Sequence, residues 1–132
     1  MCIALIMTER DPKIIALLYN EQINARSVEG CKNLMTEDHV FIDIPGKIHE
    51  GRDYMLQCWD EFFTEFPDYR NIFTRVENQE NFVILLGYST CSHEPLDGPA
   101  IWTAKIRDNL VAEWRIYEET PENRMMIGVQ QS

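Results

Sequence analysis

The chain has 132 residues, of which 45% are hydrophobic, so it is long enough to form one globular domain with a buried core. Its 22 acidic and 12 basic residues give a formal net charge of −10, which argues against binding to nucleic acid or to an anionic membrane surface. No segment has the roughly 18 consecutive apolar residues that a membrane span requires. The apolar N-terminus, MCIALIM, is too short for a signal peptide and lacks a basic flank, so we expect a cytoplasmic protein.

The spacing of the cysteines and histidines argues against a metal centre. No two cysteines form a C-x-x-C pair, which excludes the usual zinc and redox-dithiol patterns and fits a reducing compartment. The histidines lie too far apart to act as a ligand pair on one helix. These residues are Cys2, Cys31, Cys58 and Cys91, and His39, His49 and His93. We therefore expect no metal and no other cofactor.

Two helices are predicted in the first quarter of the chain. Asp11 suits a helix cap and Pro12 suits the first helical position. Apolar residues then recur with helical spacing, which places Tyr19 on the buried side: Ile15, Leu18, Tyr19 and Ile23. Ser27 can cap a short second helix that runs through Leu34.

The segment Glu37–Gly51, EDHVFIDIPGKIHEG, predicts a strand that carries one carboxylate, Asp43. Its strand-forming residues precede the Pro45-Gly46 turn: Val40, Phe41, Ile42 and Ile44. Side chains alternate along a strand, so Asp43 shares a face with Phe41. Burial of a lone carboxylate is unfavourable unless the group is paired, hydrogen-bonded or protonated. Asp43 therefore either points to water at a sheet edge or lies in a pocket with a chemical role.

The third predicted helix starts at Gly51 and has the clearest apolar stripe in the chain. Its members are three and four residues apart and predict core packing: Met55, Cys58, Trp59, Phe62, Phe63 and Phe66. Pro67 ends this helix.

From Tyr69 onward the pattern changes to strands, predicted over 71–77, 82–92, 100–107 and 110–118. His93–Pro99 is predicted to be a loop, and Asp108-Asn109 suits the positive φ angles of a tight hairpin turn. The residues after about Thr120 form a tail or a short terminal helix. Helices followed by an antiparallel meander indicate a single α+β domain over residues 1–132, with the helices on one sheet face.

Alternation along the last two strands predicts which side chains face the helices. Trp114 and Ile116 mark the inner face of the last strand, which puts Glu118 near the rim of a cavity. Trp102 faces inward on the preceding strand, whereas Tyr88 could line either face of its own strand. The predicted outer face carries Thr103, Lys105, Arg107, Arg115 and Tyr117.

A carboxylate beside a phenol and an indole indicates acid–base chemistry. An apolar pocket raises the pKa of a carboxylate toward the range of a useful base. A tyrosine hydroxyl and a tryptophan N–H can donate to an oxygen that gains negative charge. Asp43, Tyr19 and Trp102 would thus suit proton transfer next to a carbonyl group, without a metal or cofactor.

Three stretches of the chain resemble the nuclear-transport-factor-2-like cone fold, and within it the SnoaL-like polyketide cyclases and the ketosteroid isomerases. They are LLYNEQINARSVEGCKNLMTEDHVFIDIPG, IHEGRDYM and IWTAKIRDNLVAEWRIYEE. The resemblance covers about residues 14 to 120. It implies a cone-shaped, curved antiparallel sheet with three helices on its concave face, enclosing one cavity. It also implies a homodimer formed through the outer sheet face.

The resemblance also suggests roles for single residues. Tyr19 is similar to the hydrogen-bonding tyrosine of the isomerases, and Asp43, 24 residues later, is similar to their catalytic base. The protonated aspartate of their oxyanion hole, a worked example of a neutral acid, would fall at about Trp102, which is a departure. Glu118, four residues after Trp114, is similar to the acid/base carboxylate of the cyclases.

Epoxide hydrolases of the same fold share the W-R-x-Y pattern at Trp114–Tyr117. Their catalytic aspartate, however, would fall at Ile116, and their Arg-x-Asp pair is missing from YSTCSHEP. The resemblance therefore does not extend to epoxide hydrolysis.

Three hypotheses follow. In the first, the protein is an isomerase or cyclase for a small apolar carbonyl compound, with Asp43, Tyr19 and Glu118 as catalytic residues. In the second, it is a ligand-binding or accessory module. In the third, it is an adaptor that acts through its outer sheet face. A raised pKa of Asp43 favours the enzyme, and a lowered one favours a structural role. In the first two hypotheses we expect the ligand pocket to be lined by Trp102, Trp59, Trp114, Phe41, Phe63 and Tyr88.

Overall fold

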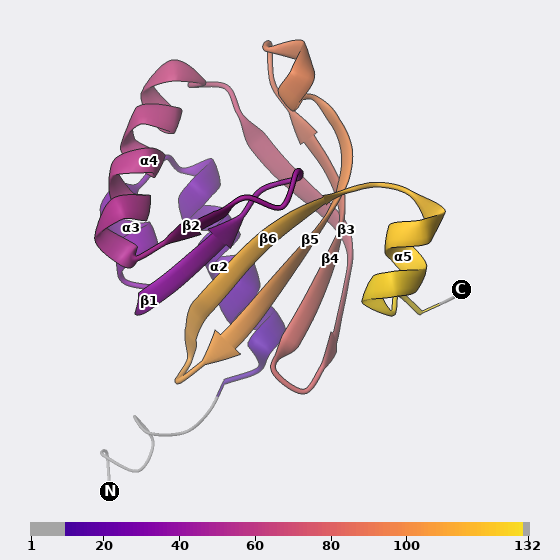
Figure 1. Ribbon diagram of the computed structural model, residues 1–132. Coiled ribbons are helices and arrows are strands. Elements are labelled where there is room, and N and C mark those ends of the chain that lie inside the picture. The colour runs from indigo at the N-terminus through magenta and orange to yellow at the C-terminus, as the bar shows by residue number, and fades with distance from the viewer. Residues whose placement is uncertain (1–9, 131–132) are drawn as a thin grey trace, which may run out of the picture.

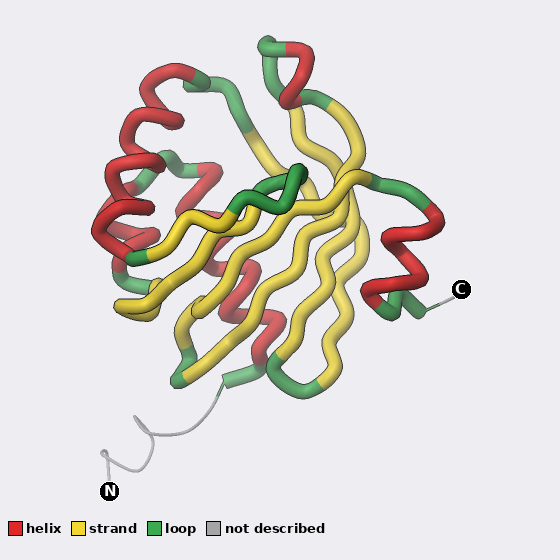
Figure 2. Tube along the Cα trace, in the orientation of Figure 1, coloured by secondary structure: helices red, strands yellow, loops and turns green. Residues whose placement is uncertain are grey.

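The computed structural model describes residues 10–130 and has a curved sheet with helices packed on both faces (Figure 1). The N-terminal stretch MCIALIM, predicted not to be a signal peptide, lies outside the described residues. Figure 2 marks the helices, strands and loops along the trace. No helix within residues 10–130 combines the length and apolar character needed to cross a membrane.

The first two helices begin where capping chemistry predicts. Asp11 accepts a hydrogen bond from the backbone N–H of Lys13, and Ser27 accepts one from Gly30. The helix bounds are α2 Pro12–Asn24, α3 Val28–Lys32, α4 Arg52–Glu65 and α5 Pro121–Ile127. The first three lie on the concave side of the sheet, and α5 lies on the outer side (Figure 1). The segment after Thr120 is therefore a short helix.

Six strands form one sheet in the order β2-β1-β6-β5-β4-β3. Their bounds are β1 Met35–Ile42, β2 Ile48–Glu50, β3 Arg70–Gln79, β4 Phe82–Thr90, β5 Gly98–Arg107 and β6 Leu110–Glu118. A 3₁₀ turn, η1 Glu94–Leu96, lies in the predicted loop between β4 and β5. The α+β cone is confirmed. One pairing differs from the expected antiparallel sheet, because β1 and β6 run parallel.

Two backbone features shape the strands. Asp108 and Asn109 have φ angles of 55° and 61°, so the predicted hairpin turn between β5 and β6 is confirmed. At Gly87 of β4, a Cβ atom would lie 1.9 Å from the carbonyl oxygen of Ile72 on β3. Glycine thus permits the two strands to approach closely next to a break in their register, where the sheet curves.

The core lies between the concave sheet face and the stripes of α2 and α4. Ile15, Tyr19 and Ile23 are buried on α2, as the stripe predicts. The α4 stripe is also directed into the core, where it packs with Trp102 and Trp114 from the sheet. Full burial of each large apolar side chain contributes about 1.5–3 kcal/mol, so these two helices hold the layers together.

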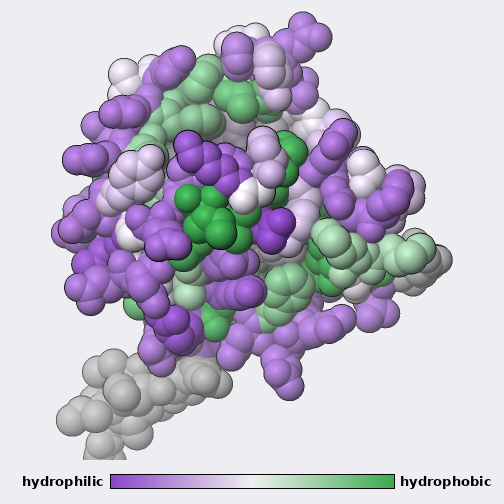
Figure 3. All heavy atoms as spheres, viewed as in Figure 1, coloured by the Kyte–Doolittle hydropathy of each residue, from purple (hydrophilic) through white to green (hydrophobic). Residues whose placement is uncertain are grey.

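The outer face is partly covered by the C-terminal segment. Ile127 and Val129 pack on Ile84, Leu86 and Ile101, and Thr120 caps α5 by accepting a hydrogen bond from the N–H of Asn123. Thr103 points outward as predicted, yet its side chain is fully buried. Hydrophobic side chains gather over α5 in the space-filling view, where Met125 and Met126 are exposed (Figure 3).

Candidate functional site

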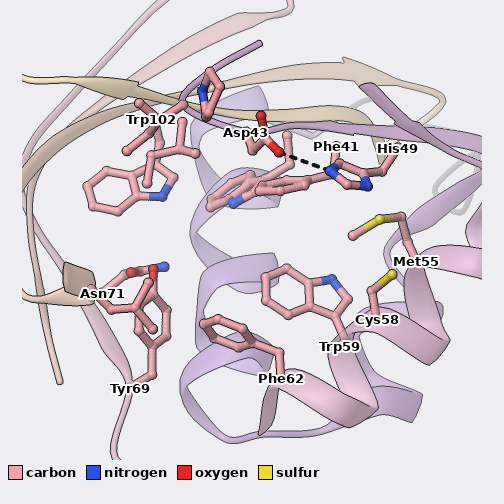
Figure 4. Close-up of a pocket in the computed structure, with 15 residues that line it drawn as sticks. Phe41, Asp43, His49, Met55, Cys58, Trp59, Phe62, Tyr69, Asn71 and Trp102 are labelled. Atoms are coloured by element: carbon pink, nitrogen blue, oxygen red, sulfur yellow. Dashed lines mark hydrogen bonds and ion pairs between the residues drawn. The ribbon is translucent and has the colours of Figure 1, made fainter. Parts of the chain in front are cut away.

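A cavity of about 340 Å³ lies between α4 and the concave sheet face. Most of its lining is apolar, and six of its side chains are aromatic: Phe41, Trp59, Phe62, Tyr69, Trp102 and Trp114. The polar exceptions are Asp43, His49 and Asn71 (Figure 4). We call the part of the wall formed by Asp43, Ile44, Pro45 and His49 the turn end. The part formed by Tyr69 and Asn71 is the buried end.

Four of the predicted pocket residues line this cavity: Trp59, Trp102, Trp114 and Phe41. Two others do not. Phe63 lies behind the wall, stacked on Trp59 with ring centroids 5.2 Å apart. Tyr88 points to the outer face and is 40% exposed, because β4 directs Val83 and Leu85 inward and the alternating residues outward. The ligand-binding role of the four remains a prediction.

Asp43 lies in a turn rather than inside a strand, because β1 ends at Ile42. Its Oδ1 accepts a hydrogen bond from the N–H of Lys47 (2.8 Å), and its Oδ2 lies 3.1 Å from Nε2 of His49. The Asp43 side chain is 28% exposed, so it is in contact with both the pocket and solvent. The predicted position of Asp43 on the pocket wall agrees with this geometry. The prediction that Asp43 lies inside a strand was wrong.

The surroundings of Asp43 favour its charged form. Partial burial raises the pKa of the carboxyl group, but the hydrogen bonds from His49 and from the N–H of Lys47 outweigh it and lower the pKa. Asp43 is therefore a carboxylate at neutral pH and a poor proton acceptor. This lowered pKa favours a supporting role for Asp43.

His49, the partner of Asp43, was not predicted from the sequence to belong to the site. It lies opposite Phe41 in the β1–β2 pairing, which brings its ring to the pocket wall. Its ring centroid is 5.7 Å from that of Phe41 and 6.3 Å from that of Tyr54, which is nearly parallel to it. Figure 4 shows the Asp43–His49 contact as a dashed line. The signal was present, because a turn at Pro45-Gly46 places residues on either side of it across from one another.

Tyr19 does not reach the cavity. It is fully buried, and its hydroxyl accepts a hydrogen bond from Nε1 of Trp59 at 3.0 Å. Its ring packs edge-on against Trp114 with centroids 5.1 Å apart. Two pocket-lining tryptophans thus stand in contact with Tyr19, which is itself absent from the lining. The prediction that the Tyr19 phenol and Asp43 lie in the same pocket was wrong. Helical spacing predicts that Tyr19 faces the core, but it does not predict how deeply the side chain is buried.

Glu118 is also remote from the pocket wall. Trp114 and Ile116 line the cavity as the alternation of β6 predicts. Glu118 is the last residue of this strand and is exposed, and its backbone carbonyl accepts a hydrogen bond from Nδ2 of Asn123. The strand leaves the cavity before Glu118 and turns toward α5. Its predicted position at the rim was therefore wrong.

Asn71 and Tyr69 form the buried end and were not assigned to the site from sequence. Asn71 is the second residue of β3 and Tyr69 immediately precedes this strand, and both side chains line the cavity. Asn71 is 3% exposed, which is unusual for an amide side chain. No group of three His, Cys, Asp or Glu side chains among residues 10–130 is arranged to hold a metal ion.

The model of the SnoaL-like domain family matches residues 16–114. No curated protein matches the chain in sequence. A structure named as a candidate SnoaL-like polyketide cyclase from Shewanella denitrificans OS-217 is similar with a TM-score of 0.72 and 13% identity, covering 90% of this chain and 98% of that one.

Two other solved structures are similar. A candidate ketosteroid isomerase from Kribbella flavida has a TM-score of 0.65 and 20% identity, with 92% of this chain and 89% of that chain covered. An epoxide hydrolase of the limonene type from M. tuberculosis has a TM-score of 0.72 and 10% identity, with 82% of each chain covered. At these identities the likeness concerns the fold.

Proposed function

Since the chain belongs to the SnoaL-like domain family, we propose that it is a cofactor-independent acid–base enzyme of the isomerase or cyclase type. Its substrate is a small, largely apolar carbonyl compound. The observation that carries this proposal is the Asp43–His49 pair on the wall of an otherwise apolar cavity. A carboxylate and an imidazole in contact with each other are the side chains that proton transfer most often uses.

In this proposal His49 is the general base and Asp43 is a positioning residue. When Nε2 of His49 carries the hydrogen, it donates to Oδ2 of Asp43, and Nδ1 then has the free lone pair. The charged carboxylate stabilises the imidazolium that forms when His49 takes a proton from the carbon next to the carbonyl group. The same imidazolium returns the proton at another atom, which completes an isomerisation.

The enolate oxygen needs a hydrogen-bond donor. The indole nitrogen of Trp102 is on the side of its ring that faces the cavity (Figure 4). In a water-poor site such a donor is most effective where negative charge develops. Trp102 is therefore the hydrogen-bond donor to the enolate oxygen in this proposal, because Tyr19, the other donor predicted from sequence, is outside the cavity lining.

The test is the exchange of the α-protons of 2-tetralone into D₂O, followed by NMR. Wild-type protein is expected to accelerate exchange over buffer, and His49→Gln to lower the protein-catalysed rate by about 10²–10⁴-fold. Asp43→Asn is expected to lower the rate less than His49→Gln does. If Asp43→Asn abolishes exchange while His49→Gln does not, Asp43 itself is the base. Wild-type exchange no faster than in buffer would refute the proposal.

A second candidate is a ligand-binding module without catalysis, and the lowered pKa of Asp43 favours it. Here the pair only closes the β1–β2 turn, through the bonds to Lys47 and His49. This module would be identified if 2-tetralone binds without accelerated exchange and if His49→Gln binds it with the same affinity as wild type.

We further propose a homodimer through the part of the outer sheet face that α5 leaves open. On this part Lys105 lies 3.7 Å from Glu113. At its border with the C-terminal segment, Arg115 lies 4.5 Å from the ring centroid of Tyr117, which packs on the same apolar cluster as Ile127 and Val129. Arg107, at the end of β5, pairs with Asp38. Sedimentation at micromolar concentration is expected to give the mass of two chains, and a monomer would contradict the proposal.

A further inference from the structure

The buried end of the pocket contains one polar atom without a partner. Asn71 lines the cavity, and its Nδ2 donates a hydrogen bond to Oδ1 of Asn20 at 3.1 Å. Its own Oδ1 is buried and has no hydrogen-bond partner among the described residues. Most buried side-chain oxygens in proteins accept a hydrogen bond, so this atom indicates a binding function.

The neighbouring amides fix the orientation of the Asn71 side chain. Asn20 uses its Nδ2 to donate to the backbone carbonyl of Asn71 (3.4 Å), so its Oδ1 faces the Asn71 amide and requires a donor there. Rotating the Asn71 amide by 180° would place its Oδ1 against Oδ1 of Asn20, and neither oxygen can donate a hydrogen bond. The acceptor of Asn71 is therefore directed away from Asn20.

The backbone of Asn71 is held just as firmly. Asn24 accepts a hydrogen bond from the N–H of Asn71 (2.8 Å) and donates one to its carbonyl oxygen (2.9 Å). With backbone and side chain both anchored to α2, the Asn71 amide cannot turn to find another partner within the protein. It offers a preorganised acceptor to whatever enters the cavity.

We propose that the pocket selects ligands that carry a hydroxyl group, which donates its hydrogen bond to Oδ1 of Asn71. This inference rests on the proposed function in one respect, namely that the cavity binds a small apolar carbonyl compound. It adds that the substrate is a hydroxylated, flat compound whose hydroxyl lies at the buried end and whose carbonyl lies toward the turn end.

The other groups at this end favour a neutral hydroxyl over a charged donor. Tyr69 lies beside Asn71 in the close-up view, and no carboxylate lines this end (Figure 4). Burial raises the pKa of Tyr69 to about 12, although its side-chain hydrogen bonds with Ser89 and Asn71 lower it, so its phenol remains neutral and adds no charge to this end. An ammonium group would find no counter-charge here and would lose its hydration.

The shape of the cavity indicates a ring compound. Trp102 and Trp114 from the sheet and Phe62 from α4 supply aromatic surfaces, and the volume of about 340 Å³ is at the small end of the range for ligand sites. A bicyclic compound with a hydroxyl on one ring and a carbonyl on the other is a suitable probe.

The test compares three probes by calorimetry: 2-tetralone, 6-methoxy-2-tetralone and 6-hydroxy-2-tetralone. The methoxy group can accept a hydrogen bond but cannot donate one. We expect the hydroxy compound to bind about 10-fold more tightly than the methoxy compound, the usual effect of one hydrogen bond to an otherwise unpaired group. Equal affinity, a preference for the methoxy compound, or no binding of any probe would overturn the proposal.

Two variants locate the effect. Asn71→Leu is expected to abolish the preference for the hydroxy compound while 2-tetralone still binds. Phe62→Leu, on α4 with its ring centroid 4.9 Å from that of Tyr69, is expected to weaken all three probes and to keep the preference. If Asn71→Leu keeps the preference, the proposal is wrong. If it does not fold, the wild-type probe series decides. Calorimetry needs no turnover, so an absence of proton exchange would refute the catalytic function and leave this result unaffected.

Discussion

The turn end and the buried end of the pocket are both polar, but they are built in opposite ways. At the turn end, Asp43 bonds to His49 and to the backbone N–H of Lys47, and it remains in contact with solvent. At the buried end, the amide of Asn71 is anchored by α2 and keeps one free acceptor. A partly solvated pair can exchange protons, whereas a buried neutral amide can only recognise a partner.

In the proposed function, the turn end carries out proton transfer and the buried end selects the ligand. Changes at the turn end should alter rate or pH dependence and affect stability little. Changes at the buried end should alter affinity and cost stability, because every group there is desolvated. A third polar group, His39, lies outside both ends and shows the effect of complete burial on a titratable side chain.

The largest effect on stability is expected from His39. Burial lowers its pKa to about 4, against the hydrogen bond to the carbonyl of Val111 and the charge of Asp38, which both raise the pKa. The unfolded chain then binds a proton more readily between pH 6.5 and pH 4. The free energy of unfolding should therefore fall as the pH drops through this window, by roughly 3 kcal/mol in total.

Urea unfolding of wild type and of His39→Leu between pH 4 and pH 7.5 measures this contribution. The variant should lose that part of the pH dependence, and the control His93→Gln, at an exposed loop residue, should keep it. An identical pH profile in wild type and His39→Leu would show that His39 is not the group responsible.

An intermediate effect is expected at the anchor of the buried end. Asn20→Leu leaves the buried Nδ2 of Asn71 without an acceptor and should lower the free energy of unfolding by about 2 kcal/mol. It also frees the Asn71 amide to rotate, so the preference for the hydroxy probe should disappear. Chemical denaturation and calorimetry on the same samples provide both values.

Asn24→Ala is the matched control, because Asn24 contacts only the backbone of Asn71. It should also lower stability but keep the preference for the hydroxy probe. A preference retained in Asn20→Leu would mean that the side-chain anchor is irrelevant to selection.

The smallest effect is expected at the turn end. Asp43→Asn should lower the free energy of unfolding at pH 7 by only about 0.5 kcal/mol, because its contacts are partly exposed and screened by solvent. Since the pKa of Asp43 is lowered by folding, its contribution is present above the ordinary pKa of aspartate and is lost as the pH falls through the folded value. A loss above 2 kcal/mol in urea unfolding would show that the pair is mainly structural.

Local patterns predicted much of this architecture. The stripe of α4, the cap at Asp11 and the turn at Asp108-Asn109 depend on residues close in sequence, and all three are present in the structure. The alternation of β5 and β6 also identified Trp102 and Trp114 as wall residues, because the direction of a side chain on a strand depends only on its parity.

The sequence by itself thus determined most of the elements and, on the last two strands, the face on which each side chain lies. Only the tertiary structure decided depth and partners: Tyr19 is sealed behind Trp59, Glu118 lies past the end of the cavity, and His49 meets Asp43. The physical reason is that periodicity fixes an angle around one helix or strand, whereas depth depends on how far other elements extend over it. The acceptor of Asn71 likewise follows from contacts with α2, some fifty residues earlier in the chain.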